Sequence, residues 1–289
     1  MRLTVKDEFG NIATSYRGVV RFTSSDRAAS LPPNYTFVEG DNGAHSFTDG
    51  VKLRTAGSQT VTVQDMDMSF LTVSQTVTVK AAPVTSLDLS LTDLASSTVT
   101  AGAPVNLTVK AVDPFSNTSA DFTETVHFTS SDKAAILPAD HTFTPADKGS
   151  HTFQVTLKTA GTQTITVTTT ITSSSGQAAP LTSRENLTVS GTITLTVKAA
   201  VASKLLLSGI RSPLTAGTSS GVTVTVTDDF GNTITSYTGT IRFSSDDSQA
   251  TLPGNYTFVA GDNGSHTFTS GIILRTAGNR SVSATDISS

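Results

Sequence analysis

Three histidines recur at one position of a repeated pattern and are the side chains best suited to acid–base chemistry or metal binding: His45, His151 and His266. Each lies two residues before a phenylalanine, so in a strand the two side chains point to the same face. No second histidine or cysteine stands beside any of them at the spacing of a metal-ligand pair. We therefore expect half-buried, hydrogen-bonded histidines at a domain edge, and we predict no metal ligands.

Two acidic loops, Asp41-Asn42-Gly43 and Asp262-Asn263-Gly264, carry oxygen atoms that could bind calcium. A calcium site needs six to eight oxygen ligands, and the spacing of an EF-hand loop is absent. Asp-Asn-Gly is also a strong turn sequence, because asparagine and glycine tolerate positive φ. We interpret both loops as turns, and the carboxylates of Asp65 and Asp67 receive the same interpretation.

Serine, histidine and aspartate all occur, but the strand–turn–helix sequence that exposes a serine nucleophile is absent. A catalytic triad repeated in three copies would also be unusual. The chain has no cysteine, which excludes disulfides and thiolate chemistry. We predict a non-enzyme, with no catalytic residue, no cofactor-binding residue and no cofactor.

The charge and hydropathy of the chain exclude two classes of partner. The formal net charge is −4 and no basic patch is present, which argues against nucleic acid and anionic membranes. No run of about 18 apolar residues exists, so this segment is not predicted to insert into a membrane.

Comparison of the sequence with itself shows three copies of one unit. Residues 3–65 match residues 224–286 without a gap, with roughly three positions in five identical. Five short patterns recur in all three copies; in the first they begin at Asp7 (Asp-x-Phe-Gly-Asn), Phe22 (Phe-x-Ser-x-Asp), Leu31 (Leu-Pro), Asp41 (Asp-x-Gly-x-His-x-Phe) and Thr55 (Thr-Ala-Gly). A repeat of this length is typical of a whole β-sandwich domain.

The sequences Val79–Ala82 and Val197–Ala200 end the first two copies. They predict domains at residues 1–82, 83–200 and 201–289, the middle one with an insertion near Thr168–Arg184. The linkers are only a few residues long, which favours a semi-rigid rod. The first copy lacks a strand matching Leu87–Leu91, and the third lacks one matching Leu71–Lys80. We expect a missing edge or an open groove in each, as in a segment of a longer chain.

The alternation of apolar and polar residues predicts an all-β fold. In the middle copy Leu107, Val109 and Ala111 share one face of a strand, and seven or more such strands are separated by Gly, Asn, Asp and Pro turns. This count and spacing indicate three tandem immunoglobulin-like antiparallel β-sandwiches, the first and last incomplete. Three phenylalanines of each copy are the predicted core anchors; in the first they are Phe22, Phe37 and Phe47.

The patterns at Asp228–Asn232, Tyr237–Ser245, Asp262–Phe268 and Thr276–Val282 resemble bacterial Ig-like repeats of very large surface and secreted proteins, related in style to the invasin and intimin domains. The resemblance implies an extracellular or cell-surface location and a non-catalytic stalk that holds a binding tip away from the cell. The middle copy departs from the pattern: it has Ser116 in place of glycine and lacks the Tyr-x-Gly pair.

Three functions are compatible with these observations. The first is a structural or adhesive stalk whose partners are the neighbouring Ig-like repeats of its own chain. The second is a module whose loops bind a surface polysaccharide or a protein; four tyrosines and no tryptophan make carbohydrate stacking less favoured. The third is a subunit of an extracellular filament that self-associates head to tail by strand addition.

Overall fold

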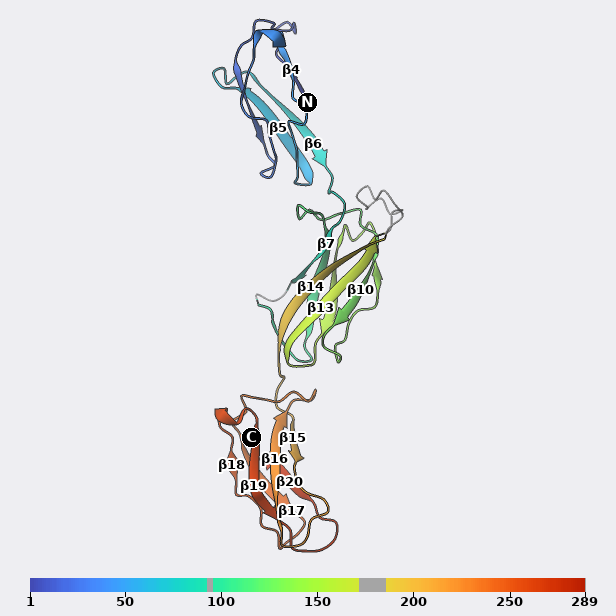
Figure 1. The fold of residues 1–289 in the computed structure, drawn as a ribbon, viewed down its shortest axis with the longest axis vertical. Helices are drawn as coiled ribbons and strands as arrows, with labels where there is room; N and C mark the ends of the chain where they lie inside the picture. Colours follow the sequence, from blue (N-terminus) through green and yellow to red (C-terminus); the bar gives the residue numbers. More distant parts are fainter. Residues whose placement is uncertain (93–95, 172–185, 289) are drawn as a thin grey trace.

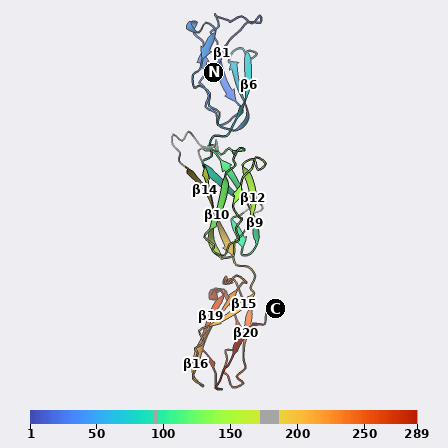
Figure 2. The same ribbon diagram turned by 90° about the vertical axis from the view of Figure 1, so that its right-hand side faces the viewer.

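The computed structural model describes residues 1–289 except 93–95, 172–185 and 289. Figures 1 and 2 show three β-rich units placed end to end along the long axis of the molecule. Each unit has its own cluster of buried apolar side chains, so three separate cores exist rather than one. Apart from two short 3-10 turns at Glu39–Asp41 and Ala260–Asp262, the described regular structure is strand, which confirms the all-β prediction.

The middle unit is a sandwich of two sheets. One sheet has the order β12 (Ser150–Thr156), β9 (Pro104–Val112) and β7 (Ser86–Leu91). The other has the order β11 (His141–Thr142), β10 (Thr125–Ser130), β13 (Gly161–Ile171), β14 (Leu187–Lys198) and β8 (Thr98–Thr100). All these strands pair antiparallel except β14 and β8.

The outer units repeat parts of this plan. In the first unit β1 (Arg2–Thr4) pairs with β4 (Ala44–Ser46), opposite the sheet β3 (Tyr35–Thr36), β2 (Val19–Ser24), β5 (Gly57–Asp65) and β6 (Thr72–Val79). In the third, β15 (Lys204–Ser208), β16 (Ser219–Thr227) and β19 (Ser265–Ile273) face β18 (Tyr256–Thr257), β17 (Thr240–Ser245) and β20 (Val282–Asp286).

The period-two pattern places the core as predicted. Leu107, Val109 and Ala111 on β9 are fully buried, because alternate side chains of a strand leave the same face of the sheet. Phe22, Phe37 and Phe47 are buried in the first unit, and the rings of Phe22 and Phe47 meet edge to face at 4.8 Å. Such aromatic anchors contribute both buried area and a defined geometry.

Two strands are absent from the described parts of the outer units, as the repeat comparison predicted. The first unit has no counterpart of β7, and β20 of the third unit pairs with β17 alone, whereas β13 of the middle unit also pairs with β14. The predicted insertion lies partly in β13, which runs to Ile171; the remainder lies outside the described residues. The domain boundaries at residues 82 and 200 stay predictions.

The structure explains why the Tyr-x-Gly pair occurs in the outer units and is absent from the middle one. The Tyr16 hydroxyl donates a hydrogen bond to Asp65, and it passes so close to Gly18 that any Cβ there would overlap the ring. In the middle unit Phe122 has no hydroxyl, and its equivalent of Gly18 is Glu124. The glycine is therefore required only where the tyrosine hydroxyl occupies that space.

Candidate functional site

The repeated Asp-x-Phe-x-Asn pattern forms a compact loop at one end of each unit. In the middle unit Asp113 Oδ1 accepts hydrogen bonds from the amides of Phe115 (2.8 Å) and Asn117 (2.9 Å). Its Oδ2 accepts from the Asn117 side chain and from the amide of Ala82, which follows β6, both at 2.8 Å. One carboxylate therefore shapes the loop and anchors the incoming linker.

The side chain of Asn117 crosses from the middle unit to the first. Its Oδ1 accepts a hydrogen bond from the amide of Ala56 at 2.8 Å, and its Nδ2 donates to the carbonyl oxygen of Arg54 at 2.6 Å. Arg54 and Ala56 belong to the turn that carries the Thr-Ala-Gly pattern. The first recurrent pattern of one unit thus binds the last recurrent pattern of the unit before it.

The second junction repeats this arrangement. Asn232 Oδ1 accepts from the amide of Ala160 at 2.7 Å, and its Nδ2 donates to the carbonyl oxygen of Lys158 at 2.7 Å. Asp228 Oδ2 accepts from the linker amide of Ala200 at 2.9 Å. We refer to this pair of asparagine hydrogen bonds, with the aspartate that orients the asparagine, as the junction latch.

The backbone that the latch binds is itself fixed by a buried carboxylate from the Phe-x-Ser-x-Asp pattern. Asp132 Oδ2 accepts from the amides of Lys158 (2.6 Å) and Thr159 (2.9 Å), and Oδ1 accepts from the Thr159 hydroxyl at 2.6 Å. Asp26 and Asp247 make the equivalent bonds in the outer units. Three patterns recognised separately in the sequence therefore meet at each junction: the aspartate of Phe-x-Ser-x-Asp holds the Thr-Ala-Gly turn, and the asparagine of Asp-x-Phe-x-Asn binds that turn.

The latch aspartate is buried where its loop packs against a preceding unit. Asp113 and Asp228 are buried, whereas Asp7, which forms the same loop in the first unit, is exposed. Burial acts to raise the pKa of Asp228, but the hydrogen bonds from Asn232, Ala200 and Phe230 outweigh it and hold the pKa below its ordinary value. Asp228 is therefore charged at neutral pH, as its four acceptor contacts require.

The phenylalanine of the loop packs on the preceding unit. The Arg54 guanidinium lies 5.8 Å from the centre of the Phe115 ring, within the range of a cation–π contact. Phe230 lies directly against Gly102 of the middle unit, so a Cβ at residue 102 would overlap the ring. Phe9, at the same position of the loop in the first unit, is 81% exposed.

The recurrent histidines have the role predicted for them in the outer units. His45 is half-buried, its Nδ1 lies 2.7 Å from Asp41 Oδ1, and its ring stacks on Tyr35 with centroids 4.0 Å apart. His266 repeats this contact with Asp262 at 2.8 Å. The acidic loops are turns, as expected, since Asn42 and Asn263 both adopt the left-handed conformation.

The middle unit differs at this position, and the expectation that no second histidine stands beside His151 is wrong there. His141 replaces the tyrosine, and its ring stacks on His151 at 4.3 Å. His141 and His151 lie on β11 and β12, strands of different sheets. The two histidines are ten residues apart in the sequence, which matches no common spacing of metal ligands. The sequence feature that could have revealed the pair is His141 itself, which stands where the aligned copies have Tyr35 and Tyr256.

Asp65 closes the turn after β5, in agreement with the turn expected from the sequence. Asp65 is buried and accepts hydrogen bonds from the amides of Asp67 (2.8 Å) and Met68 (2.7 Å) besides that from Tyr16. Its carboxylate is therefore used in closing the turn after β5.

Within the part of the chain that the structure describes, no helix has the length and apolar character needed to cross a membrane.

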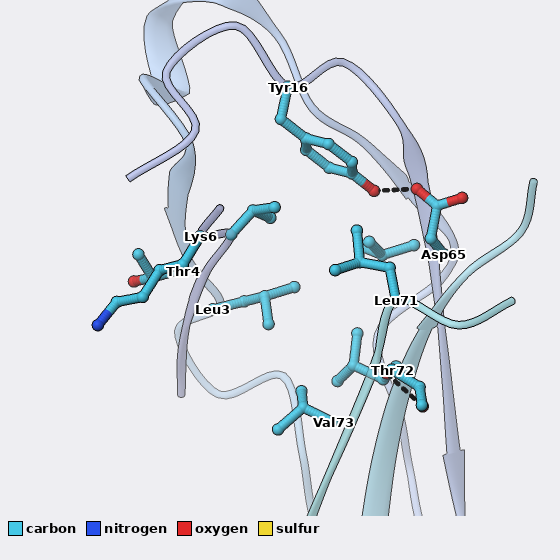
Figure 3. A pocket seen from close by; sticks show the side chains of 11 residues that line it. Leu3, Thr4, Lys6, Tyr16, Asp65, Leu71, Thr72 and Val73 are labelled. Carbon is cyan, nitrogen blue, oxygen red and sulfur yellow. Dashed lines mark hydrogen bonds between the residues drawn. The ribbon is translucent and has the colours of Figure 1, made fainter. Parts of the chain in front are cut away.

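An apolar groove of about 90 Å³ opens between the two sheets of the first unit. Leu3 lines one side and Leu71 the other (Figure 3), and Val5 and Val73 also belong to the lining. In the middle unit the same place is filled by β7: Leu89 pairs with Val109, the counterpart of Leu3, and it packs against Gly191 of β14. The groove therefore marks where the missing strand would lie.

The fold and the latches define a chain of β-sandwich units joined by a repeated contact. Among solved structures, the chain is similar to the Escherichia coli adhesin FdeC, with 21% identity and a TM-score of 0.39, covering all of this chain and 87% of that one. It is also similar to the bacterial integrin-binding protein invasin, with 16% identity and a TM-score of 0.35, covering 98% of this chain and 52% of that one.

A third likeness is to β-glucuronidase 3 of Bacteroides uniformis, with 14% identity and a TM-score of 0.24, covering 70% of this chain and 23% of that one. No protein-family model matches the chain, and no curated protein matches it by sequence.

Proposed function

We propose that this chain is a non-catalytic, semi-rigid spacer in a cell-surface or secreted repeat protein, serving as a structural or adhesive stalk. The observation that carries the proposal is the repetition of the junction latch: Asn117 and Asn232 bind the preceding unit through the same two backbone groups. A contact repeated with the same geometry at successive junctions sets one preferred orientation between neighbours.

The linker makes this contact effective. A hydrogen bond contributes about 0.5–1.5 kcal/mol net, so two of them with one aromatic contact would hold two separate domains only weakly. A linker of a few residues raises the effective concentration of the neighbouring unit to the millimolar range. The latch can then form again after each opening, and its opening unfolds neither unit, as a stalk under load requires.

Distances between spin labels test the stalk directly. The chain has no cysteine, so cysteines introduced on exposed strand positions, Gln75 of β6 and Arg242 of β17, label the first and third units alone. We expect a narrow distance distribution that broadens in the double variant Asn117→Ala with Asn232→Ala. A distribution equally broad in the unsubstituted chain contradicts a semi-rigid spacer.

Head-to-tail assembly by strand addition is a second proposed role, favoured by the groove of the first unit. The occupant would be an extended segment with alternating leucines, like Ser86–Leu91, supplied by a second copy of the chain. Sedimentation velocity over a hundredfold range of concentration tests it. A single monomer boundary throughout rules this role out, and association that Leu3→Asp abolishes supports it.

A further inference from the structure

The middle unit carries a cluster of three potential metal ligands, and the described residues of the outer units contain no equivalent cluster. One ligand atom each from His141, Asp147 and His151 lie within 4.8 Å of one another. His151 Nδ1 is 2.6 Å from Asp147 Oδ1, and His141 Nε2 is 3.6 Å from Asp147 Oδ2. The three side chains come from β11, the turn after it and the start of β12, so they join the two sheets at one edge of the sandwich.

The aligned copies show what this cluster replaces. In the first unit the Tyr35 hydroxyl donates to both oxygens of Asp41, at 3.2 and 3.1 Å, and Tyr256 does the same to Asp262. A hydroxyl and a histidine therefore satisfy the carboxylate in the outer units. In the middle unit the imidazole of His141 is shorter than tyrosine, and its nitrogen does not reach hydrogen-bond distance from Asp147.

The substitution leaves a buried nitrogen without a hydrogen-bond partner. His141 Nε2 is shielded from solvent and has no hydrogen-bond partner among the residues that the structure describes. An unsatisfied buried polar atom costs about 1–3 kcal/mol, so the histidine is unfavourable at this place unless something else occupies the site. A cation bound between the two rings and the carboxylate would satisfy this nitrogen.

We propose that His141, Asp147 and His151 bind a divalent late transition-metal ion, with Zn²⁺ the preferred probe and solvent as the fourth ligand. Two imidazoles and one carboxylate match the three-protein-ligand sites of zinc, whereas calcium and magnesium take oxygen ligands. Ligands about 2.0–2.1 Å from a tetrahedral ion lie roughly 3.4 Å apart, so the His151–Asp147 contact opens slightly when the ion replaces the shared proton.

The carboxylate is already oriented for this role. Asp147 Oδ2 accepts hydrogen bonds from the Thr144 amide at 2.7 Å and from its hydroxyl at 2.8 Å. Outer contacts of this kind hold a ligand in place and are a regular feature of metal sites. The bound ion would link β11 to β12 and pin the two sheets of the middle unit together.

The experiment is Zn²⁺ titration of the full chain, freed of metal by chelator, with isothermal calorimetry and thermal unfolding as readouts. We expect one Zn²⁺ per chain and a higher melting temperature of the middle unit with Zn²⁺ than with chelator. Substituted Co²⁺ should give the intense visible absorption of a tetrahedral site. Absence of saturable Zn²⁺ binding, or a Co²⁺ spectrum of a six-coordinate aquo-type ion, would overturn the proposal.

Three variants distinguish Zn²⁺ binding at this site from Zn²⁺ binding by histidines elsewhere in the chain. His141→Tyr restores the Tyr–Asp–His set of the outer units, so it should fold normally and bind Zn²⁺ at least tenfold more weakly. Tyr256→His creates the cluster in the third unit and should raise the stoichiometry towards two. His127→Ala, which removes an exposed histidine paired with Asp140, should leave the affinity unchanged. Binding that His141→Tyr does not weaken contradicts the assignment.

Discussion

The side-chain nitrogen of Asn117 donates a hydrogen bond to the backbone carbonyl of Arg54, 63 residues earlier in the chain and in a different unit. The same bond joins Asn232 to Lys158 at the second junction. Neither bond depends on the side chain of the acceptor residue, which explains how arginine and lysine alternate at that position. A junction built on backbone acceptors fits any neighbour that keeps the turn.

Replacement of Asn117 by alanine should loosen the first junction without unfolding either unit. Two hydrogen bonds across the junction, of about 0.5–1.5 kcal/mol each, are lost together with the bond from Asn117 to Asp113 inside the loop. Spin labels on Gln75 and Thr129 should then report a broader distance distribution. Asn11→Ala is the control, because Asn11 bonds Asp7 in the same loop but bonds no preceding unit. Equal broadening in both variants would refute the latch.

Acidification should open the second junction. The pKa of Asp228 is lower in the folded chain than its ordinary value of 3.8. Its contribution to stability is therefore complete above the unfolded pKa and is lost as the pH falls through the folded pKa. Labels on Thr129 and Arg242 should show the same distribution from about pH 7 down to the ordinary aspartate value of 3.8, and a broader one as the pH falls further, through the folded pKa below that value.

Asp228→Asn provides the comparison for this acid effect. The Asp228 carboxylate accepts four hydrogen bonds, and the uncharged amide of asparagine cannot replace it. The second junction of this variant should therefore already be loose at neutral pH. It should change little on acidification. An acid response as large as that of the unsubstituted chain would show that another group controls the junction.

Alanine substitutions of Gly102 and Gly217 test the contact between Phe230 and the middle unit. Both adopt positive φ, +79° and +83°, but Phe230 lies against Gly102 whereas nothing lies within 4 Å of Gly217. Alanine at either position incurs the same backbone strain, about 1 kcal/mol. Only Gly102→Ala should also broaden the distances between Thr129 and Arg242. If Gly217→Ala has an equal effect, the contact with Phe230 is not part of the junction.

Completion of the first unit should stabilise it. Residues 83–106 appended before Met1 would supply a strand like β7, and each leucine entering the groove contributes about 1.5–3 kcal/mol. Calorimetry should show a higher melting temperature for the first unit. The same extension with Leu87 and Leu89 replaced by serine should give no gain; a gain that survives these changes would mean that the groove is not the binding place.

The sequence alone determined the class of fold and the core. Alternation of apolar residues is a local property of a strand, so the spacing of Leu107, Val109 and Ala111 suffices to assign them to one buried face. Repetition of the same pattern three times also located the missing strands. These features need no knowledge of how distant segments meet.

Tertiary structure alone decided what the recurrent polar residues do. Asn117 was visible as part of a repeated turn, but its partners lie in another unit, and no periodicity links residues 54 and 117. His141 and His151 belong to strands of different sheets, so only the packing of the sandwich places their rings side by side. Hydrogen bonds and ligand sets are made between such distant segments, because it is the folded backbone, rather than sequence spacing, that sets the distance between side chains.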